Sequence, residues 1–492
     1  MQHTSDILII GAGFGGSMLA MGLAKQGWSV VVVDRAQHPR FAIGESSTPI
    51  ADMILRDLAA RYDWDWLQPL TRYGSWKATY PDLTCGLKRG FSYFAHTPGQ
   101  PFQPNLQHSN ELLVAASSSD TASDTQWLRA DVDAFLAGRA RDAGIRLHEG
   151  TTISALHRTD DGWLAKGVDA ERVPLSWRPR FVLDASGAGG VVPRLLGVAP
   201  SDEPFETHSY AVYSHFENVA PWPDLYAQAG GELATHPFTC DAAALHHLLE
   251  EGWMWQLRFN DGRVSAGLML EGAPTADAPA QMWANILRRY PSIQAQLADA
   301  RLADVPGQFI QAPRVQRRWA RGAGKGWAAL PSTIGFIDPL HSTGIAHTLS
   351  GVERLLHAFG TDGPSSETLH RYEQQVFAEL RLIDQLVAGC YHARSHFGVF
   401  TSYVMAYFAA VTTYERARTQ HASHAPFAQA FLCAENTDLS ARIDQIYQRL
   451  VTKPPSPADF AHFVEDIIAP YNEVGLFHPA KPNMYEHTAA QL

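Results

Sequence analysis

Cysteine is scarce in this sequence. Only four of the 492 residues are cysteines: Cys85, Cys240, Cys390 and Cys433. They form no CxxC pair and have no group of histidines beside them, which excludes the usual zinc ribbons and the disulfide frameworks of small secreted domains. We therefore expect neither a disulfide nor a bound metal.

Long hydrophobic runs and excess positive charge are also missing. The N-terminal MQHTSDILIIGAG has a short apolar run that ends in glycines, as a strand entering a turn does and a signal peptide does not. The most apolar late segment, FTSYVMAYFAAV, is too short to span a bilayer. A net charge of −11 disfavours binding to nucleic acids or anionic membranes. The sequence predicts a soluble, cytoplasmic protein.

Lysine is the third rarity, with seven lysines among the 39 basic residues. One of them, Lys88, lies in TCGLKRGFSYFAH at 84–96, just before Tyr93, Phe94 and His96. Lysines are mostly exposed, so the segment taken alone favours a solvated strand or hairpin edge. The alternative is a reactive ammonium that faces an aromatic pocket formed by the residues after it. The rest of the sequence has to decide between them.

The clearest pattern is a βαβ unit at the start of the chain. ILII at 7–10 and SVVVV at 29–33 are β-branched runs typical of buried parallel strands, and SMLAMGLAKQGW between them has helical spacing. Further strands of this kind are expected within 180–187 and 326–339. The predicted fold class is therefore α/β: a discontinuous, doubly wound (Rossmann-like) fold interrupted by long insertions.

The insertions follow other patterns. Residues 74–126 are rich in turn formers and aromatics, residues 205–270 alternate apolar with polar positions, and the spacing becomes helical after about residue 345. We expect three units: a discontinuous nucleotide-binding domain of residues 1–73, 127–200 and 305–360, an inserted mixed β-sheet substrate domain of residues 74–126 and 201–304, and a C-terminal helical cap of residues 361–492.

GAGFGG at 11–16 supplies Gly11, Gly13 and Gly16 of a GxGxxG turn between the first strand and helix. Glycine is needed there because the turn is tight and the backbone must approach a pyrophosphate at the helix N-terminus. Asp34 ends the second strand, where it can accept hydrogen bonds from a ribose diol. Together these features predict a bound dinucleotide.

Three further segments resemble FAD-dependent enzymes of the aromatic hydroxylase type. They are WLRADVDAFL at 127–136, LDASGAGG at 183–190 and GFIDPLHSTGIAHTL at 335–349. The resemblance implies that Arg129 contacts FAD, that Asp338 lies near its ribityl chain, and that the turn leading to Gly344 and Ile345 lies along the isoalloxazine. The purely structural alternatives are that Arg129 only pairs with a nearby acid and that the turn before Gly344 is an ordinary helix start.

Two more segments narrow the resemblance to the flavin-dependent halogenases. EGWMWQLRF at 251–259 carries a GWxWxL block with Trp253 and Trp255, and HPRFAIGESSTP at 38–49 closely follows Asp34. With CGLKRG and DPLHSTGIAH, the pattern is most similar to the branch acting on free phenols. It implies that Arg40, Glu45 and Ser46 belong to a strap at the flavin and that the tryptophans, on one face of a strand, separate flavin from substrate. Plain core packing of the two tryptophans is the alternative.

The resemblance also implies an activity. Reduced FAD reacts with O₂ to form a flavin hydroperoxide, chloride or bromide attacks it, and the hypohalous acid formed reaches Lys88, which passes the halogen to a small electron-rich aromatic compound. Ser342, Thr343 and Gly344 match the halide nest, although they can equally cap the following helix. A separate NAD(P)H-dependent flavin reductase would supply the reduced FAD. Such enzymes serve secondary metabolism, including antibiotic biosynthesis, and dimers are common among them.

His341 departs from the pattern of the halogenases of free tryptophan, which have a glutamate at this position. It either hydrogen bonds to the oxidant or is a plain helix-start residue; the change favours a phenol over an indole. Whether Lys88 acts as a neutral amine or a charged donor stays open, and Lys77 is its only nearby rival. The alternative functions are a single-component FAD-dependent phenol hydroxylase and, from other classes, a flavin-binding redox sensor or an isoprenoid reductase.

Overall fold

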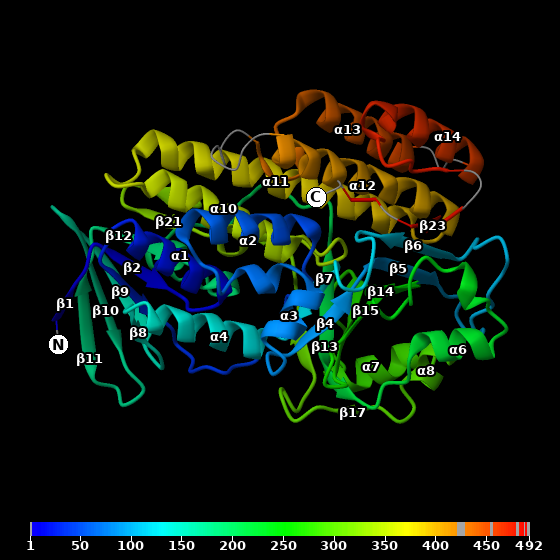
Figure 1. The fold of residues 1–492 in the computed structure, drawn as a ribbon, viewed down its shortest axis with the longest axis horizontal. Coiled ribbons are helices and arrows are strands. Elements are labelled where there is room, and N and C mark those ends of the chain that lie inside the picture. The colour runs from blue at the N-terminus through cyan, green and yellow to red at the C-terminus, as the bar shows by residue number, and fades with distance from the viewer. Residues whose placement is uncertain (1, 421–428, 453–455, 479–481, 487, 490–492) are drawn as a thin grey trace.

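The computed structural model describes residues 2–420, 429–452, 456–478, 482–486 and 488–489. Figure 1 shows two sheet-containing halves side by side, with a layer of long helices from the C-terminal third of the chain lying across both. The parts of the predicted 361–492 helical cap at 421–428, 453–455, 479–481, 487 and 490–492 lie outside the described residues.

The first half is built on a six-stranded sheet in the order β20-β21-β12-β2-β3-β8. Its strands are β2 (Ile7–Ile10), β3 (Val30–Val33), β8 (Arg146–His148), β12 (Phe181–Asp184), β20 (Ala323–Gly324) and β21 (Trp327–Ala329). β12, β2, β3 and β8 run parallel, and β2 and β3 are buried along their whole length, which explains their continuous apolar sequences. The predicted strands at 7–10, 29–33 and 180–187 are confirmed. The segment 326–339 holds β21 but then turns into the short helix α9 (Pro331–Ile334).

Helices cover this sheet. α1 (Phe14–Lys25) connects β2 to β3 and packs against α4 (Arg129–Asp142) and α10 (Thr343–Phe359). A separate four-stranded sheet flanks the nucleotide sheet; it contains β1 (Gln2–Thr4), β9 (Thr152–Thr159), β10 (Gly162–Val168) and β11 (Pro174–Arg178). The α/β fold class is confirmed.

The second half is a nine-stranded mixed sheet in the order β17-β13-β16-β15-β14-β5-β6-β23, with β18 beside β13. Its strands are β5 (Gly90–Ala95), β6 (Glu111–Ala115), β13 (Ser209–Glu217), β14 (Ala244–Leu249), β15 (Gly252–Arg258), β16 (Val264–Glu271), β17 (Arg301–Leu302), β18 (Ile310–Ala312) and β23 (Met484–Tyr485). β5 pairs parallel with β14, whereas β14, β15, β16 and β13 pair antiparallel. β23 comes from the C-terminal region, so that region is not purely helical.

A two-stranded ribbon connects the halves. It consists of β4 (Cys85–Lys88) and β7 (Asp124–Trp127), and β4 also contacts β15 of the second sheet. The contact is close because a methyl group at Gly86 would lie 2.0 Å from the carbonyl oxygen of Arg258. On the other side, Ser46 forms a bridge to Gln126. Lys88 thus lies where the two halves meet.

The long helices form the third layer. They are α10, α11 (Ser366–Ala393), α12 (Phe397–Gln420), α13 (Thr437–Thr452) and α14 (Pro457–Ile468). α12 is buried on most sides, as expected for a helix that is apolar nearly all round. No described helix is long and apolar enough to cross a membrane.

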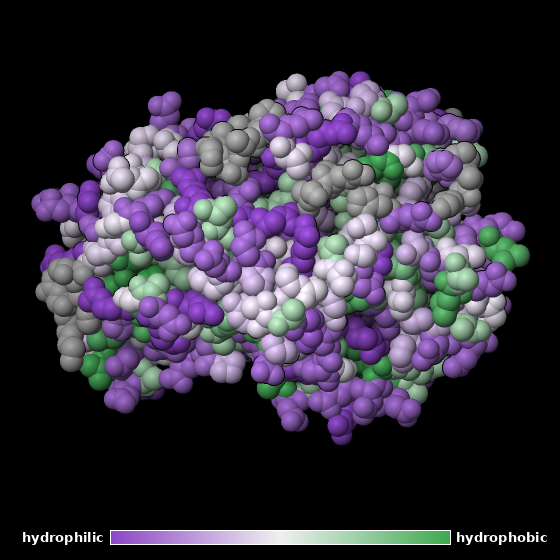
Figure 2. All heavy atoms as spheres, viewed as in Figure 1, coloured by the Kyte–Doolittle hydropathy of each residue, from purple (hydrophilic) through white to green (hydrophobic). Residues whose placement is uncertain are grey.

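The surface seen in Figure 2 is mostly hydrophilic, with apolar side chains scattered over it singly or in small groups. The largest hydrophobic core instead runs beneath α1, α10, α11 and α12, and two smaller cores lie within the second half. All four cysteines are buried and free, which confirms that no disulfide links the described parts of the chain.

Gly16 tests the packing of α1 against β2. A methyl group there would lie 1.9 Å from the carbonyl oxygen of Gly11, so Gly16→Ala forces the first turn of the helix away from the strand. We expect a loss of roughly 1–3 kcal/mol in the free energy of unfolding, measured by urea denaturation. Gly138→Ala in α4, where a methyl group meets nothing within 4 Å, is the control and should be neutral or stabilising. Wild-type stability of Gly16→Ala would contradict this packing.

Candidate active site

Lys88 is completely buried at the end of β4. The residue is 0% exposed, its ammonium donates a hydrogen bond to the carbonyl of Ser47, and its Nζ lies 4.4 Å from the ring centroid of Phe91. The solvated-edge interpretation of Lys88 is therefore wrong. Its rival Lys77 instead donates to the carbonyl of Pro81 at 3.2 Å in exposed surroundings.

Two aspartates that the sequence analysis did not single out accompany Lys88. Asp124 is its direct partner across the β4–β7 ribbon, and Asp52 lies in the first turn of α2 (Pro49–Tyr62). Paired residues in an antiparallel ribbon project to the same face. Both aspartates are buried, and Asp52 hydrogen bonds to Asp124. Only the ribbon register and the start of α2 bring the three together, so no local motif marks them.

Burial controls the protonation of this cluster. It raises the pKa of Asp52 well above its usual range, and the neighbouring Asp124 adds to the shift. Burial also raises the pKa of Asp124 to about 6, although the charge of Lys88 opposes this. Burial lowers the pKa of Lys88 to about 8, against the attraction of both aspartates. At pH 7 Asp124 is therefore mostly a carboxylate and Lys88 mostly protonated, while the raised pKa of Asp52 favours its neutral form.

His341 lies near this cluster as a neutral ring. It stacks on Tyr407 with 4.1 Å between centroids, and the Tyr407 hydroxyl donates to the His341 carbonyl at 2.8 Å. Burial lowers the pKa of His341 to about 3. Its Nδ1 has no hydrogen-bond partner among the described residues, and its Nε2 lies 3.8 Å from Cys390 Sγ. The His341 ring can donate or accept a hydrogen bond, but near neutral pH it carries no positive charge.

The structure separates the aromatic residues that follow Lys88. Tyr93 lies parallel to Phe91, the ring beside Lys88, with 6.3 Å between centroids, and contacts α12. Phe94 and His96 pack against α6 (Trp222–Gln228) on the opposite face of the sheet. Alternate residues of a strand face opposite sides. The single pocket expected to contain all three side chains does not form, and only Tyr93 lies on the Lys88 side.

Trp253 and Trp255 share one face of β15, as predicted, with 6.1 Å between their rings. Trp253 Nε1 donates to the hydroxyl of Tyr391 at 3.1 Å, and that hydroxyl donates to Asp338 Oδ2 at 2.8 Å. Burial raises the pKa of Asp338 to about 6. A hydrogen-bonded path therefore joins the tryptophan block to the segment before α10.

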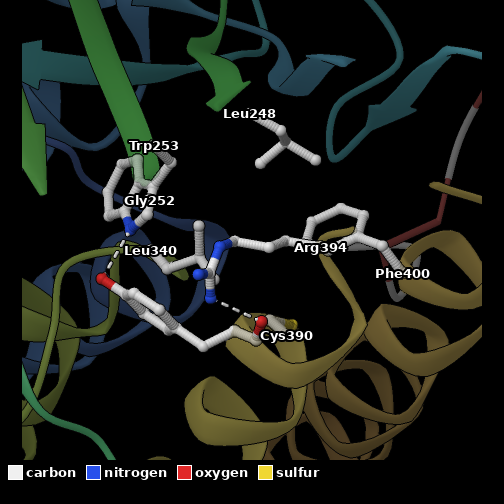
Figure 3. Close-up of a pocket in the computed structure, with 8 residues that line it drawn as sticks. Leu248, Gly252, Trp253, Leu340, Cys390, Arg394 and Phe400 are labelled. Atoms are coloured by element: carbon white, nitrogen blue, oxygen red, sulfur yellow. Dashed lines mark hydrogen bonds between the residues drawn. The ribbon is translucent and has the colours of Figure 1, made fainter. Parts of the chain in front are cut away.

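A small cavity of about 10 Å³, room for about one water molecule, lies beside this path (Figure 3). Its lining residues are Leu248, Gly252, Trp253, Leu340, Cys390, Tyr391, Arg394 and Phe400. In Figure 3 the guanidinium of Arg394 reaches across the mostly apolar lining, and it donates to the Tyr391 carbonyl at 2.8 Å.

The start of α10 is not capped by a side chain. Ser342 is the N-cap residue and adopts a left-handed conformation with φ 51°, and its hydroxyl donates to the Ser46 hydroxyl at 3.0 Å instead of capping the helix. The backbone donors of the first turn, at Thr343 and Gly344, therefore have no side-chain acceptor from the N-cap residue. The expectation of a simple side-chain N-cap is wrong for Ser342.

The glycine-rich loop fits a dinucleotide. Gly11 has φ +108° and a methyl group there would lie 2.4 Å from the Ala185 carbonyl oxygen, so the turn requires glycine. A methyl group at Gly13 would point at Arg40 and Arg129, 3.4 and 3.6 Å away. The two arginines suit a diphosphate at the start of this helix, where the Phe14 N–H donates to Asp133 Oδ1 at 3.1 Å.

Asp34 and Arg129 shape this site. Asp34 accepts hydrogen bonds from the backbone of Ala12 at 2.7 Å and Ala36 at 2.9 Å, which fixes its carboxylate at the end of β3. Arg129 pairs with Asp133, as the purely structural alternative expected. It also donates at 3.1 Å to the carbonyls of Ile43 and Gly44 and so holds the strap that precedes α2.

Glu45 and Ser46 in this strap point to different neighbours. Glu45 is buried and its Oε1 lies 2.9 Å from His215 Nε2 of β13. Ser46 bonds to Ser342 at the start of α10. The strap therefore contacts the second sheet and the helix layer at once, as a segment between cofactor and halide sites would.

Comparisons with known proteins identify what this arrangement resembles. Residues 125–400 match the family model described as tryptophan halogenase, and residues 9–83 match a NAD(P)-binding Rossmann-like domain. The chain is 29% identical over 466 residues to the monodechloroaminopyrrolnitrin halogenase PrnC of Pseudomonas fluorescens, covering 88% of this chain and 79% of that protein. It is 27% identical over 412 residues to the tetracycline 7-halogenase of Kitasatospora aureofaciens, covering 81% and 71%.

Among solved structures, the halogenase PltM in complex with phloroglucinol and FAD superposes with a TM-score of 0.85 at 25% identity, covering 99% of this chain and 100% of that one. The brominase Bmp2, at 18% identity, 94% and 99% coverage and a TM-score of 0.59, shares the fold.

The buried Lys88 predicts a pH dependence of stability. Because its pKa is about 8 in the folded chain and near 10.5 when unfolded, the unfolded chain binds more protons between these values, and the folded state gains up to about 1.4 kcal/mol per pH unit from this residue. Lys88→Met should remove that rise between pH 8 and 10 in urea denaturation. Lys77→Met, on a more exposed helix, is the control. An unchanged slope in Lys88→Met would contradict the shift.

Proposed function

The chain belongs to the tryptophan halogenase family, and from this premise we propose that its Lys88 delivers an oxidised halogen to a small phenol. The enzyme is a flavin-dependent halogenase that uses reduced FAD and a halide to halogenate an aromatic compound. Membership of this family sets aside the hydroxylase, redox-sensor and reductase alternatives. The proposal adds the residue that transfers the halogen and the kind of ring that receives it.

The observation that carries the proposal is the burial of Lys88 between a carboxyl pair and an aromatic wall. Hypohalous acid is small and indiscriminate, so an enzyme that uses it must hold it at one nucleophile. Burial lowers the pKa of the Lys88 amine, and the charges of Asp124 and Asp52 oppose that shift. Burial with specific charge partners is the setting in which side chains are adapted for chemistry.

We assign FAD to the region between the glycine-rich loop, the strap and the start of α10. The proposed contacts are Gly11, Gly13, Gly16, Asp34, Arg40, Glu45, Ser46, Arg129, Asp338, Gly344 and Ile345. When bound, reduced FAD supplies the electrons with which O₂ converts a halide into hypohalous acid. Arg40 and Arg129 offset the charge of the diphosphate, and Asp34 accepts from the ribose diol.

The halide is assigned to the start of α10, at Ser342, Thr343 and Gly344. Because the Ser342 hydroxyl is engaged with Ser46, it leaves the backbone donors of this turn to an anion. The positive end of the helix dipole favours the same charge. The strap that presents Ser46 also contacts the Lys88 side through Ser47, so the halide and Lys88 sites are neighbours along one segment.

Halogen transfer then needs only residues of this chain. The Lys88 ammonium gives a proton to the Asp124 carboxylate, and the amine displaces water from hypohalous acid as its N–halogen bond forms. The ring carbon of the substrate next takes the halogen as that bond breaks, the ring proton passes to the amine, and Asp124 returns the first proton to Lys88. Asp52 donates a hydrogen bond to Asp124 throughout. Atoms and protons balance over the cycle.

The receiving ring is proposed to be a phenol. Indole halogenases of the resembled family place a glutamate where this chain has His341, and here that histidine is neutral and stacked on Tyr407. Such a ring adds no charge to activate the oxidant. A phenol needs less help because its own oxygen enriches the ring, and PltM, which shares this fold, was solved with phloroglucinol. Tyr93, Trp253 and Trp255 are the proposed walls of its pocket.

We further propose that a separate NAD(P)H-dependent flavin reductase supplies reduced FAD, because the sequence has one glycine-rich dinucleotide loop in a strand–helix context. Such a reductase would act with the enzyme in the cytoplasm. The proposed domain division is that residues 1–73, 127–200 and 305–360 bind FAD and residues 74–126 and 201–304 bind the substrate. Two strands of the second sheet, β18 and β23, lie outside the latter ranges.

Lys88→Met is the test of the delivery residue. The variant should still bind FAD and generate hypohalite, detected with a soluble halogen scavenger, yet lose halogenated product by at least roughly 10²-fold. The assay contains FAD, NADH, an unrelated flavin reductase, chloride or bromide and a panel of phenols and indoles, read by mass spectrometry. Lys77→Met is the matched control and should keep full activity.

Three outcomes would overturn the proposal. Full halogenation by Lys88→Met removes the delivery role, and halogenation of indoles but not phenols removes the substrate class. Full activity in Lys88→Arg, which keeps a charged donor that does not become a neutral amine, would replace halogen transfer through nitrogen by hydrogen bonding to hypohalous acid.

Asp124→Asn tests the proton acceptor. Because the pKa of Asp124 is about 6, wild-type product formation should fall as the pH drops below 6, where this carboxylate becomes protonated. Asp124→Asn should lower the rate by roughly 10²-fold and abolish that acidic limb in initial rates measured from pH 5 to 8. Asp120→Asn, a change at the exposed partner of Arg89, is the control. If the acidic limb persists in Asp124→Asn, the limb belongs to another group and Asp124 is not the proton acceptor.

A further inference from the structure

On the face of the second sheet that is turned away from Lys88, three ligand-type side chains meet. Glu111 is the first residue of β6, His108 lies in the loop before it, and His236 directly follows the short helix η3 (Leu233–Thr235). One potential ligand atom from each lies within 4.8 Å of the others. From these residues, we propose that His108, Glu111 and His236 bind a divalent transition-metal ion of the zinc class, which pins two loops of the second half together.

The distances leave little movement to make. His108 Nδ1 lies 2.5 Å from Glu111 Oε1, and His236 Nε2 lies 3.4 Å from Glu111 Oε2. Tetrahedral zinc with bonds near 2 Å holds its ligand atoms about 3.3 Å apart. Small movements of these side chains bring both contacts to that spacing, and the three ligand atoms of the cluster already lie within 4.8 Å of one another.

The second observation is that three buried polar atoms of this cluster lack hydrogen-bond partners. The side chains of Glu111 and His236 are 0% and 2% exposed. Among the described residues, Glu111 Oε2 and both ring nitrogens of His236 have no hydrogen-bond partner, because the 3.4 Å contact lacks the required geometry. Buried polar atoms of this kind normally have a partner. A bound cation would satisfy Glu111 Oε2 and His236 Nε2 together.

The charge of Glu111 points the same way. Among the described residues, its ion-pair partners are the two histidines, with no lysine or arginine. Burial opposes its ionisation, but contacts with His236, His108 and Tyr226 hold its pKa below the usual value, so the carboxylate is charged. A buried carboxylate needs a compensating charge, and imidazole nitrogens beside a carboxylate are common metal ligands.

The surroundings also match a metal site. The Tyr226 hydroxyl of α6 donates to Glu111 Oε1 at 2.8 Å, the type of outer hydrogen bond that orients a ligating carboxylate. The His108 side chain is 11% exposed, which provides an entry path. His₂Glu is a zinc donor set that leaves a fourth position for water. The carbonyl of His108 accepts from Asn483, beside β23, so the metal would also steady the C-terminal strand.

The experiment measures metal in the full-length, untagged protein. Zinc content by mass spectrometry should be one equivalent per chain in the wild type and below roughly a tenth of that in Glu111→Gln and His236→Ala. Adding Zn²⁺ to chelator-treated wild type should raise its melting temperature by roughly 2–4 °C. Co²⁺ in its place should give the visible absorption of a four-coordinate site.

Glu149→Gln is the matched control, because Glu149 also lies 2.5 Å from a histidine, His38, but has only one. It should keep the zinc equivalent. Wild type that binds no zinc and gains no stability from it, or an equal zinc loss in Glu149→Gln, would overturn the proposal and leave a buried hydrogen-bonded network. The Co²⁺ absorption spectra of Glu111→Gln and Glu149→Gln are compared as well, because a change in stability alone does not alter such a spectrum.

Discussion

The burial of Lys88 is the constraint on which the rest of the site depends. An ammonium taken out of water costs several kcal/mol unless charges and hydrogen bonds replace the solvent. Here the replacements come from three separate elements: Asp124 across the β4–β7 ribbon, Asp52 in the first turn of α2, and the Ser47 carbonyl of the strap. The ribbon, the strap and α2 must therefore meet in one arrangement, and that arrangement joins the nucleotide half of the enzyme to its second sheet.

The same junction connects the two ends of the chemistry. The strap reaches α10 through the Ser46–Ser342 hydrogen bond, whereas Asp338, just before α10, is joined through Tyr391 to Trp253. Tyr391 lies on α11, so the C-terminal helices form part of the site instead of a separate cap. In the proposed mechanism, an oxidant formed at the start of α10 is linked to Lys88 through the strap and to the tryptophan block through Asp338 and Tyr391.

Local patterns predicted the elements well and the contacts between them poorly. The β-branched runs, the glycine turn and the GWxWxL alternation depend on neighbours in sequence, so the βαβ unit and the shared face of Trp253 and Trp255 could be predicted. Asp124 became visible only through the register that places it opposite Lys88. Phe94 was misjudged because adjacency in sequence outweighed strand alternation. The cluster of His108, Glu111 and His236 escaped because a search for cysteine spacings cannot detect histidines and a carboxylate that lie far apart in the sequence.

A site that handles an electrophilic halogen must also spare its own nucleophiles. Cys390 lines the pocket, with its Sγ 3.8 Å from His341 Nε2. Thiolates react far faster than thiols, and burial raises the pKa of Cys390 well above its usual range. The neutral His341 beside it offers no charge to stabilise a thiolate, whereas the glutamate of the indole enzymes is absent. Low polarity here therefore favours a protonated, poorly nucleophilic Cys390, and in the proposed mechanism it leaves the halogen to the Lys88 amine, whose proton Asp124 can take.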